Sequence, residues 1–336
     1  MVTGGAGFIG SHTVVELDHA GYKPIIVDNF QNSEKSVIRG LEHILEKKVT
    51  YYEVDCNDPD ALRHVFAREQ NIAGAIHFAA DKAVGDSVAH PVKYYRNNIG
   101  SLITLLELMA EFGVHDLVFS SSCTVYGQPD TLPVTEQSPI QPAQSPYGNT
   151  KQICEEVIRD TVASGATLRA LSLRYFNPIG AHPSSEIGEL PLGVPSNLVP
   201  FIVQTAAGIR EQMSIFGHDY RTADGTCVRD YIHVVDLAKA HVSALKVLAD
   251  KDEDGFYDFV NLGTGKGATV LEVVRAFERV TGQKVNYQLT DRRPGDVEQI
   301  YASVDKAADM LEWKTERSLD EALRDAWNWQ LKLSKK

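Results

Sequence analysis

The chain has 336 residues, of which 43% are hydrophobic and 23% are charged, and its formal net charge is −12 at pH 7. This length suggests about two domains, and the composition is that of an ordinary globular protein. No run approaches the roughly 18 apolar residues of a membrane span, and the N-terminus lacks a secretory-signal pattern. The negative charge argues against nucleic acid or an anionic membrane as a partner, so we expect a cytoplasmic protein.

The cysteines and histidines give no sign of a metal site. Cys56, Cys123, Cys154 and Cys227 are scattered, with no CxxC pair and no spacing typical of zinc ligands. The 11 histidines include no HxxxH pair with a nearby acid. We therefore expect reduced thiols and no bound metal.

A glycine-rich turn opens the chain, with Gly4, Gly7 and Gly10 spaced GxxGxxG. Such a turn brings the backbone close to a pyrophosphate, which the N-terminus of the following helix then binds. The predicted strand before the turn is almost absent because the chain starts at Met1. Either this strand is unusually short or residues are missing, and the sequence leaves both open.

The first half then alternates short β-type runs with amphipathic segments, which is typical of βαβ units. The strands are apolar on both faces, as strands covered by helices should be. We predict strands at 24–28, 49–54, 75–79, 116–120 and 168–174 and helices at 11–20, 60–70, 101–112 and 147–163. The fold class is therefore α/β, a Rossmann-type doubly wound parallel sheet with a smaller α+β substrate domain.

The composition changes near residue 177, where a stretch rich in Pro, Gly and Ser at 177–197 predicts a loop. We therefore expect a dinucleotide-binding domain at 1–176 and a substrate-binding domain at 177–336. The segment at 228–263 is expected to return to the first domain.

Asp28 ends the second predicted strand. A carboxylate there can bind both hydroxyls of an adenosine ribose and would repel a 2′-phosphate, which favours NAD over NADP. The alternative is an ordinary strand-end cap. Asp55 and Cys56, after the third strand, are placed to meet the adenine.

Tyr147 and Lys151 lie four residues apart on a predicted helix, with Ser145 as its cap and Pro146 at its first position. A tyrosine is a poor base at neutral pH, so we expect the ammonium of Lys151 and a nicotinamide cation to lower its pKa. Ser122 ends a serine run on the preceding strand and can hydrogen-bond Tyr147 or the reacting hydroxyl.

Several longer motifs carry a resemblance. TGGAGFIG, the serine run and YxxxK resemble the extended short-chain dehydrogenase/reductase family. HFAADKAVGDS, SSSCTVYG, SPYGNTK, RYFNPIGAH, GTCVRDYIHVVDLA and RRPGD are similar to the UDP-glucose 4-epimerases within it, from residue 2 to about Trp329. The resemblance implies interconversion of UDP-glucose and UDP-galactose through a 4-keto intermediate, with transient hydride transfer to a retained NAD. It also implies a homodimer that packs the helices starting near Ser101 and Tyr147.

The resemblance assigns roles residue by residue. Tyr147 takes the proton of the sugar 4-hydroxyl, Ser122 assists, and Lys151 holds the nicotinamide ribose. The implied cofactor contacts are Gly4, Gly7, Phe8, Ile9, Gly10, Asp28, Asn29, Asn32, Ser33, Asp55, Cys56, Phe78, Ala79, Ala80, Lys82, Asn97, Tyr147, Lys151 and Phe176. The implied substrate contacts are Lys82, Ser122, Tyr147, Asn177, Asn197, Leu198, Phe216, Arg229, Arg293, Asp296 and Ile300, with Arg292 as an adjacent candidate for the diphosphate.

The chain departs from the family pattern at four places: the short first strand, Ala80-Asp81, Cys123 and Ile300. Ile300 takes a position whose bulk limits the sugar 2-substituent, so UDP-N-acetylhexosamines and UDP-glucuronate remain alternative substrates. A 4,6-dehydratase is more remote, because Cys123-Thr124 stand where that reaction needs an Asp-Glu pair. A non-catalytic NAD-sensing regulator is disfavoured by the presence of both Tyr147 and Lys151.

Overall fold

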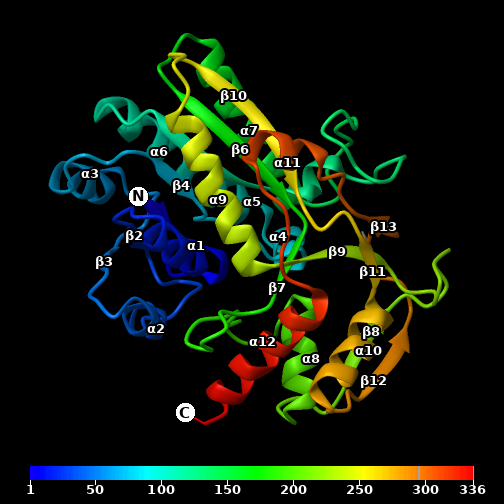
Figure 1. Cartoon of the computed structure of the whole chain (residues 1–336). Helices are drawn as coiled ribbons and strands as arrows, with labels where there is room; N and C mark the ends of the chain where they lie inside the picture. Colours follow the sequence, from blue (N-terminus) through cyan, green and yellow to red (C-terminus); the bar gives the residue numbers. More distant parts are fainter. Residues whose placement is uncertain (294–295, 336) are drawn as a thin grey trace.

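The computed structural model describes residues 1–293 and 296–335. Its centre is a seven-stranded sheet in the order β10-β6-β5-β4-β1-β2-β3, in which every pair of neighbours is parallel (Figure 1). The strands are β1 (Val2–Thr3), β2 (Ile25–Asp28), β3 (Thr50–Glu53), β4 (Ala75–His77), β5 (Asp116–Ser122), β6 (Arg169–Tyr175) and β10 (Phe256–Leu262). The predicted doubly wound parallel sheet is confirmed.

The strand order reverses at β1, which lies between β2 and β4. In sheets of this kind, ligands bind at the carboxyl edge beside such a reversal, and the glycine turn leaves β1 at this point. The strand itself has only two residues. Its pairing extends to Met1, whose amino group donates to the carbonyl oxygen of Gly74 at 2.8 Å and whose carbonyl oxygen accepts from the amide of Ile76 at 2.9 Å.

Helices cover both faces of the large sheet. One apolar core joins the sheet to α1 (Phe8–His19), α2 (Ser36–Leu45), α9 (Val234–Ala249) and α11 (Asp305–Leu311). A second core on the opposite face joins it to α3 (Pro59–Arg68), α6 (Gly100–Glu111) and α7 (Pro146–Ala163). Between β4 and α6 lie α4 (Val84–Ala89), α5 (Pro91–Tyr94) and the π-helical turn η1 (Tyr95–Ile99), and the 3-10 turn η2 (Cys123–Tyr126) follows β5.

Two expectations about this sheet are wrong. The strand β3 was expected to be apolar on both faces, but it is an edge strand with mostly exposed side chains, and Tyr51 is 42% exposed. An edge strand has a neighbour on one side only, so it needs less apolar surface. The first helix begins at Phe8 rather than Ser11, because the glycine turn leads directly into it with Gly7 as its cap.

The remaining elements form a smaller unit. A four-stranded sheet contains β7 (Asn177–Ile179), β9 (Val228–His233), β11 (Gly267–Thr269) and β13 (Gln299–Ile300), and a second, parallel pair contains β8 (Met213–Phe216) and β12 (Tyr287–Thr290). These strands pack with α8 (Leu198–Ala206), α10 (Val270–Thr281) and α12 (Leu319–Leu333) around a core of their own (Figure 1).

The chain passes between the two units more than once. It leaves the large sheet at Phe176, and β7 pairs with β9 in the smaller sheet, so the loop predicted from residue 177 is wrong for 177–179. It returns through α9, which packs on α1, and through β10, which pairs with β6. The predicted domain limits remain our proposal. No helix within the described residues has the length and apolar character needed to cross a membrane.

Candidate active site

The glycine turn fits a closely approaching ligand because two of its positions exclude a side chain. Gly4 has φ +67°, and a Cβ there would lie 2.7 Å from the amide nitrogen of Ala79. A Cβ on Gly10 would lie 2.3 Å from the carbonyl oxygen of Gly4. The N-terminus of α1, at Phe8 and Ile9, is thereby held beside the end of β4. Its first turn contains no acidic side chain, and no side chain caps Gly7, which suits an anion such as a pyrophosphate.

Asp28 lies at the carboxyl end of β2, next to this turn. One carboxylate oxygen accepts from the amide of Ala6 at 3.0 Å, and the other accepts from the amide of Phe30 and the hydroxyl of Ser33, both at 2.9 Å. Asp28 therefore also stabilises the turn and the following loop, which is the structural role expected of an ordinary strand-end cap. A carboxylate has about four acceptor sites, so capacity for a ribose hydroxyl remains.

The other predicted cofactor contacts of this region surround Asp55. Its carboxylate accepts from the side chain of Asn29 at 3.1 Å and from the amide of Asn57 at 2.8 Å. Burial raises the pKa of Asp55, but these hydrogen bonds outweigh it and lower the pKa overall. Cys56 is buried beside it, where burial raises the pKa of the thiol to about 12, and Asn32 is exposed on the loop after β2.

The wall beyond the glycine turn comes from the residues after β4. Phe78, Ala79 and Ala80 are partly buried, and Asn97 lies close by, accepting from Asn57 at 2.9 Å. Asp81, one of the departures from the family pattern, turns its carboxylate toward Lys93, 3.6 Å away. The charge at this position is thus paired with α5.

The catalytic helix begins as predicted. Ser145 caps α7, its hydroxyl accepting from the amide of Gly148 at 3.1 Å, and Pro146 occupies the first helical position. Lys151 is buried and donates a hydrogen bond of 2.7 Å to the carbonyl oxygen of Ser120 on β5. Its Nζ atom lies 5.9 Å from the centre of the Tyr147 ring. Ser122, Tyr147 and Lys151 therefore converge at the carboxyl end of β5.

Burial dominates the pKa values of Tyr147 and Lys151. Burial raises the pKa of Tyr147 to about 12, and a hydrogen bond with Ser122 opposes this rise only in part. Burial also lowers the pKa of Lys151 to about 8, against the influence of Cys154 and Glu155. The expectation that Lys151 and a nicotinamide cation together lower the pKa of Tyr147 stays a prediction, since in the protein alone the cost of desolvating the phenolate dominates. A further positive charge is needed to favour the phenolate.

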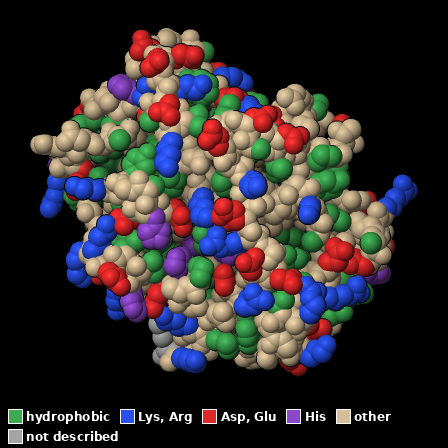
Figure 2. Space-filling view, in the orientation of Figure 1, with side chains coloured by type: hydrophobic (Ala, Val, Ile, Leu, Met, Phe, Trp, Pro, Cys, Tyr) green, Lys and Arg blue, Asp and Glu red, His purple; other side chains and the backbone are tan. Residues whose placement is uncertain are grey.

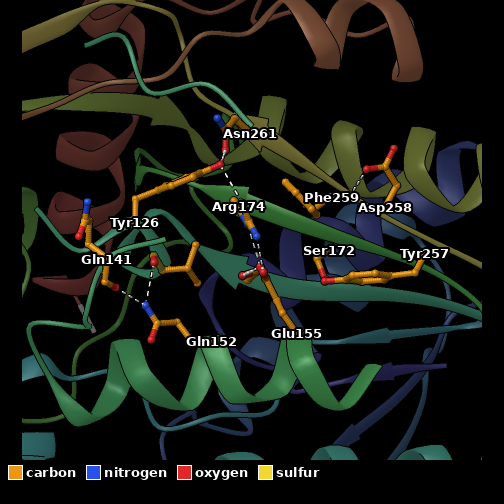
Figure 3. Close-up of polar contacts among 12 residues, drawn as sticks. Tyr126, Gln141, Gln152, Glu155, Ser172, Arg174, Tyr257, Asp258, Phe259 and Asn261 are labelled. Atoms are coloured by element: carbon orange, nitrogen blue, oxygen red, sulfur yellow. Dashed lines mark hydrogen bonds and ion pairs between the residues drawn. The ribbon is translucent and has the colours of Figure 1, made fainter. Parts of the chain in front are cut away.

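A buried polar network behind this site was not found from the sequence (Figure 3). Arg174 and Glu155 form an ion pair with contacts of 2.9 and 2.5 Å, and both are almost fully buried. Glu155 also accepts from Ser121 at 2.5 Å, next to Ser122. Arg174 donates to the hydroxyl of Tyr126, which in turn donates to Asn261 on β10. Glu155 lies one helical turn after Lys151, and this spacing is the only sequence signal that could have revealed it.

The second unit brings four of the predicted substrate residues together. Asp296 lies 3.8 Å from Arg229 on β9 and 2.7 Å from Arg293. The guanidinium of Arg293 also lies 5.7 Å from the ring of Phe216, whose side chain is exposed. Arg292 instead contacts Asp219 at 2.7 Å and stacks on Tyr220. The Pro-Gly of the RRPGD motif lies outside the described residues.

Three other predicted contacts lie near the boundary between the units. Asn177 begins β7, and Asn197 and Leu198 stand at the start of α8. The amide of Asn197 donates to Glu189 at 2.6 Å, and Lys82 donates to the same carboxylate oxygen at 3.2 Å. Glu189 was not identified from the sequence.

Ile300 is buried in a small apolar cluster at the end of β13. The cluster also contains Cys123, Tyr126 and Phe176, so two departures from the family pattern lie in one cluster. Ile300 reaches it because β13 pairs with β9, opposite Arg229. The role of Ile300 toward the sugar 2-substituent stays a prediction.

Acidic and basic side chains are interspersed over the face shown in Figure 2. Among the predicted substrate contacts, Lys82, Arg229 and Arg293 each lie beside a carboxylate, in a chain whose net charge is −12. No group of three or more His, Cys, Asp or Glu side chains within the described ranges is arranged to hold a metal ion.

A doubly wound sheet, a glycine turn at its reversal point and a buried Tyr-Lys pair beside a serine strand define a short-chain dehydrogenase/reductase of the extended class. The family model described as GDP-mannose 4,6 dehydratase matches residues 1–326. A UDP-glucose 4-epimerase of Bacillus subtilis is 50% identical over 331 residues, covering 98% of this chain and 96% of the relative. The chain belongs to the UDP-glucose 4-epimerase family.

Two solved structures share the whole fold. The UDP-glucose 4-epimerase of Stenotrophomonas maltophila, solved with NAD and formylated UDP-arabinopyranose, has a TM-score of 0.95 at 44% identity and covers 99% of this chain and 98% of its own. That of Bifidobacterium longum, solved with NAD+ and UDP, has a TM-score of 0.94 at 44% identity and covers 98% of this chain and 97% of its own.

Proposed function

We propose that this chain interconverts UDP-glucose and UDP-galactose by epimerisation at C4, with a retained NAD. The observation that carries the proposal is the convergence of Tyr147, Lys151 and Ser122 at the sheet edge that also holds the glycine turn. The family relationship and the NAD and UDP bound by solved relatives support the same assignment.

The glycine turn and Asp28 fit a dinucleotide, because Gly4 and Gly10 leave no room for a Cβ and Asp28 retains acceptor capacity. NAD, when bound, supplies the acceptor for the hydride of the sugar C4 and returns hydride to either face of that carbon. Burial alone raises the pKa of Tyr147 to about 12, and the positive charge of a bound nicotinamide would lower that pKa by favouring the phenolate. The carboxylate of Asp28 would repel the 2′-phosphate of NADP, so it favours NAD, which has no such phosphate.

The chain's own residues manage the proton. Tyr147 removes the proton of the 4-hydroxyl and gives it back, and Ser122 holds the phenolic oxygen and the sugar hydroxyl in line. Lys151 is fixed to the carbonyl oxygen of Ser120, so its ammonium stays near the ring of Tyr147 and within reach of a ribose.

Substrate binding must depend mostly on the nucleotide end, since both C4 configurations of the sugar have to fit. Arg229 and Arg293 are proposed to bind the diphosphate, where charged donors are strong. Asp296, Phe216, Leu198, Asn177 and Asn197 complete the nucleotide side. The binding energy gained there positions the sugar, which itself is held weakly.

We also propose a homodimer in the cytoplasm. The dimer would pack α6 and α7, and exposed apolar side chains at Ile103 on α6 and at Val88 and Val92 on α4 and α5, which contact α7, support this face. Light scattering at micromolar concentration tests it, and a monomer mass would contradict the proposed dimer.

The decisive experiment mixes purified protein with UDP-galactose without added cofactor and follows the anomeric protons by NMR. Formation of UDP-glucose supports 4-epimerisation with a retained NAD. If nothing forms, the mixture is repeated with added NAD. Activity that appears only with added NAD contradicts the retention of NAD but not the epimerisation. Continued inactivity contradicts the proposed substrate pair.

A further inference from the structure

The carboxylate of Glu189 joins two residues of the proposed substrate site. Its Oε1 atom accepts from Nζ of Lys82 at 3.2 Å and from Nδ2 of Asn197 at 2.6 Å. Lys82 follows β4 of the large sheet, whereas Asn197 precedes α8 of the smaller unit. One carboxylate oxygen thus spans the boundary between the two units.

Glu189 is held in place by Trp329 on α12, which packs against the backbone of Gly188 and Glu189. Its carbonyl oxygen accepts from Nε1 of Trp329 on α12 at 2.9 Å. The preceding Gly188 lies so close to this indole that a Cβ there would be 2.5 Å from Cδ1 of Trp329. The Glu189 side chain is only 11% exposed, while that of its partner Lys82 is 45% exposed. The anion is therefore the fixed member of the pair and the cation is the accessible one.

The same arrangement recurs at the other predicted diphosphate contacts. Arg229 and Arg293 share the carboxylate of Asp296, at 3.8 and 2.7 Å. Asp296 already has a proposed role toward the nucleotide, but nothing in the proposed mechanism uses Glu189. An anion beside a cation that receives a diphosphate must either release that cation or share it with the ligand.

We propose that Glu189 is a positioning residue that aligns Lys82 with Asn197 and competes with the substrate diphosphate for the Lys82 ammonium. This inference rests on the proposed function. The competition weakens the binding of UDP-sugars and so favours release of the product, which has the same nucleotide as the substrate. Because Lys82 is nearly half exposed, its pair with Glu189 is a weak one, and we expect an effect of roughly twofold to fivefold on affinity.

The test measures the Kd of UDP by titration calorimetry on the NAD-loaded protein at low ionic strength. Glu189→Gln keeps an acceptor for Asn197 but removes the charge, so UDP should bind roughly twofold to fivefold more tightly. Glu189→Asp, which keeps the charge, should stay closer to the wild-type value. Glu316→Gln removes one charge from the distant pair with Lys239 and serves as the control, with no change in Kd.

A double-mutant cycle distinguishes competition from a merely structural role. In a Lys82→Met background the gain from Glu189→Gln should disappear, because no ammonium is left to compete for. Unchanged or weaker UDP binding in Glu189→Gln, or an equal gain without Lys82, would overturn the inference. If the wild-type protein converts UDP-galactose but shows these outcomes, only the role of Glu189 fails. If it neither binds UDP nor converts the sugar, the proposed function itself fails.

Discussion

Lys151 on α7 donates a hydrogen bond of 2.7 Å to the carbonyl oxygen of Ser120 on β5. This bond fixes the helix that carries Tyr147 to the strand that ends in Ser122, so the three side chains are aligned before any ligand arrives. A buried ammonium satisfied by a neutral carbonyl is also costly to keep charged, which is why burial lowers the pKa of Lys151 to about 8.

Tyr147→Phe should reduce kcat by roughly 10²-fold to 10⁴-fold, because it removes the group that moves the proton of the 4-hydroxyl. NAD should remain bound, since the glycine turn and Asp28 are untouched. Steady-state kinetics with UDP-galactose and the absorbance of released cofactor measure both effects. Tyr257→Phe, which removes a hydroxyl on β10 that bonds Ser172, is the matched control and should leave kcat within twofold or so. Near-normal turnover of Tyr147→Phe would refute the assigned role.

Asp28→Ala should weaken NAD binding by roughly tenfold to a hundredfold, because it removes a charged acceptor for the ribose and the bonds that order the turn at Ala6. Equilibrium dialysis of the cofactor-free protein with NAD measures the loss. Gln31→Ala, on the exposed part of the same loop and not an expected cofactor contact, tests whether any change in the loop suffices. Equal losses in the two variants would argue against a specific role for Asp28.

Glu155→Leu should destabilise the protein by about 3–5 kcal/mol, since it leaves the guanidinium of Arg174 buried without its counterion. The double variant Glu155→Leu/Arg174→Met removes both charges and should recover much of this loss. Urea unfolding of both variants gives the comparison. The exposed pair of Lys239 with Glu316 provides the reference, where Glu316→Gln should cost at most about 1 kcal/mol. A small effect of Glu155→Leu would contradict the importance of this ion pair.

The protein should lose stability as the pH falls below about 6.5, the ordinary pKa of histidine. Burial lowers the pKa of His12 and His77 to about 3 and that of His182 and His241 to about 4 in the folded state. The unfolded chain therefore binds more protons between pH 6.5 and 4, and each histidine contributes a slope of about 1.4 kcal/mol per pH unit.

Urea unfolding at several pH values across this window measures the slope. His241→Leu removes one of these protons and should reduce the slope by about a quarter of the histidine contribution, because four histidines share it. An unchanged slope in this variant would show that His241 takes up no extra proton on unfolding.

UDP-N-acetylglucosamine should be turned over slowly, because Ile300, which we propose lies beside the sugar 2-substituent, is intermediate in bulk. Ile300→Tyr should abolish this turnover while UDP-galactose is still converted, since a larger side chain fills the space that the acetyl group needs. NMR of both substrates with both proteins provides the measurement. Complete inertness of the wild-type protein toward the N-acetyl sugar, beside activity on UDP-galactose, would contradict the prediction.

The features that depend on short-range spacing could be predicted from the amino-acid sequence alone. The glycine turn, the acid at the end of β2, the Ser145 cap and the Tyr147-Lys151 pair all rest on residues a few positions apart, where backbone geometry dictates which side chains share a face. The parallel sheet followed from alternating patterns, although β3 was expected to be covered on both faces and is an exposed edge strand instead.

The features that depend on burial and on distant partners could not be predicted from the sequence and are seen only in the folded chain. The pKa of Tyr147 rises because the surrounding chain excludes water, which no spacing of Tyr and Lys reveals. Glu155 on α7 meets Arg174 on β6, and Glu189 before α8 meets Lys82 after β4, because the fold packs these separate segments together. Charges so far apart in the sequence acquire a partner only when the fold brings them within a few ångströms, and at that distance the local dielectric sets their energy.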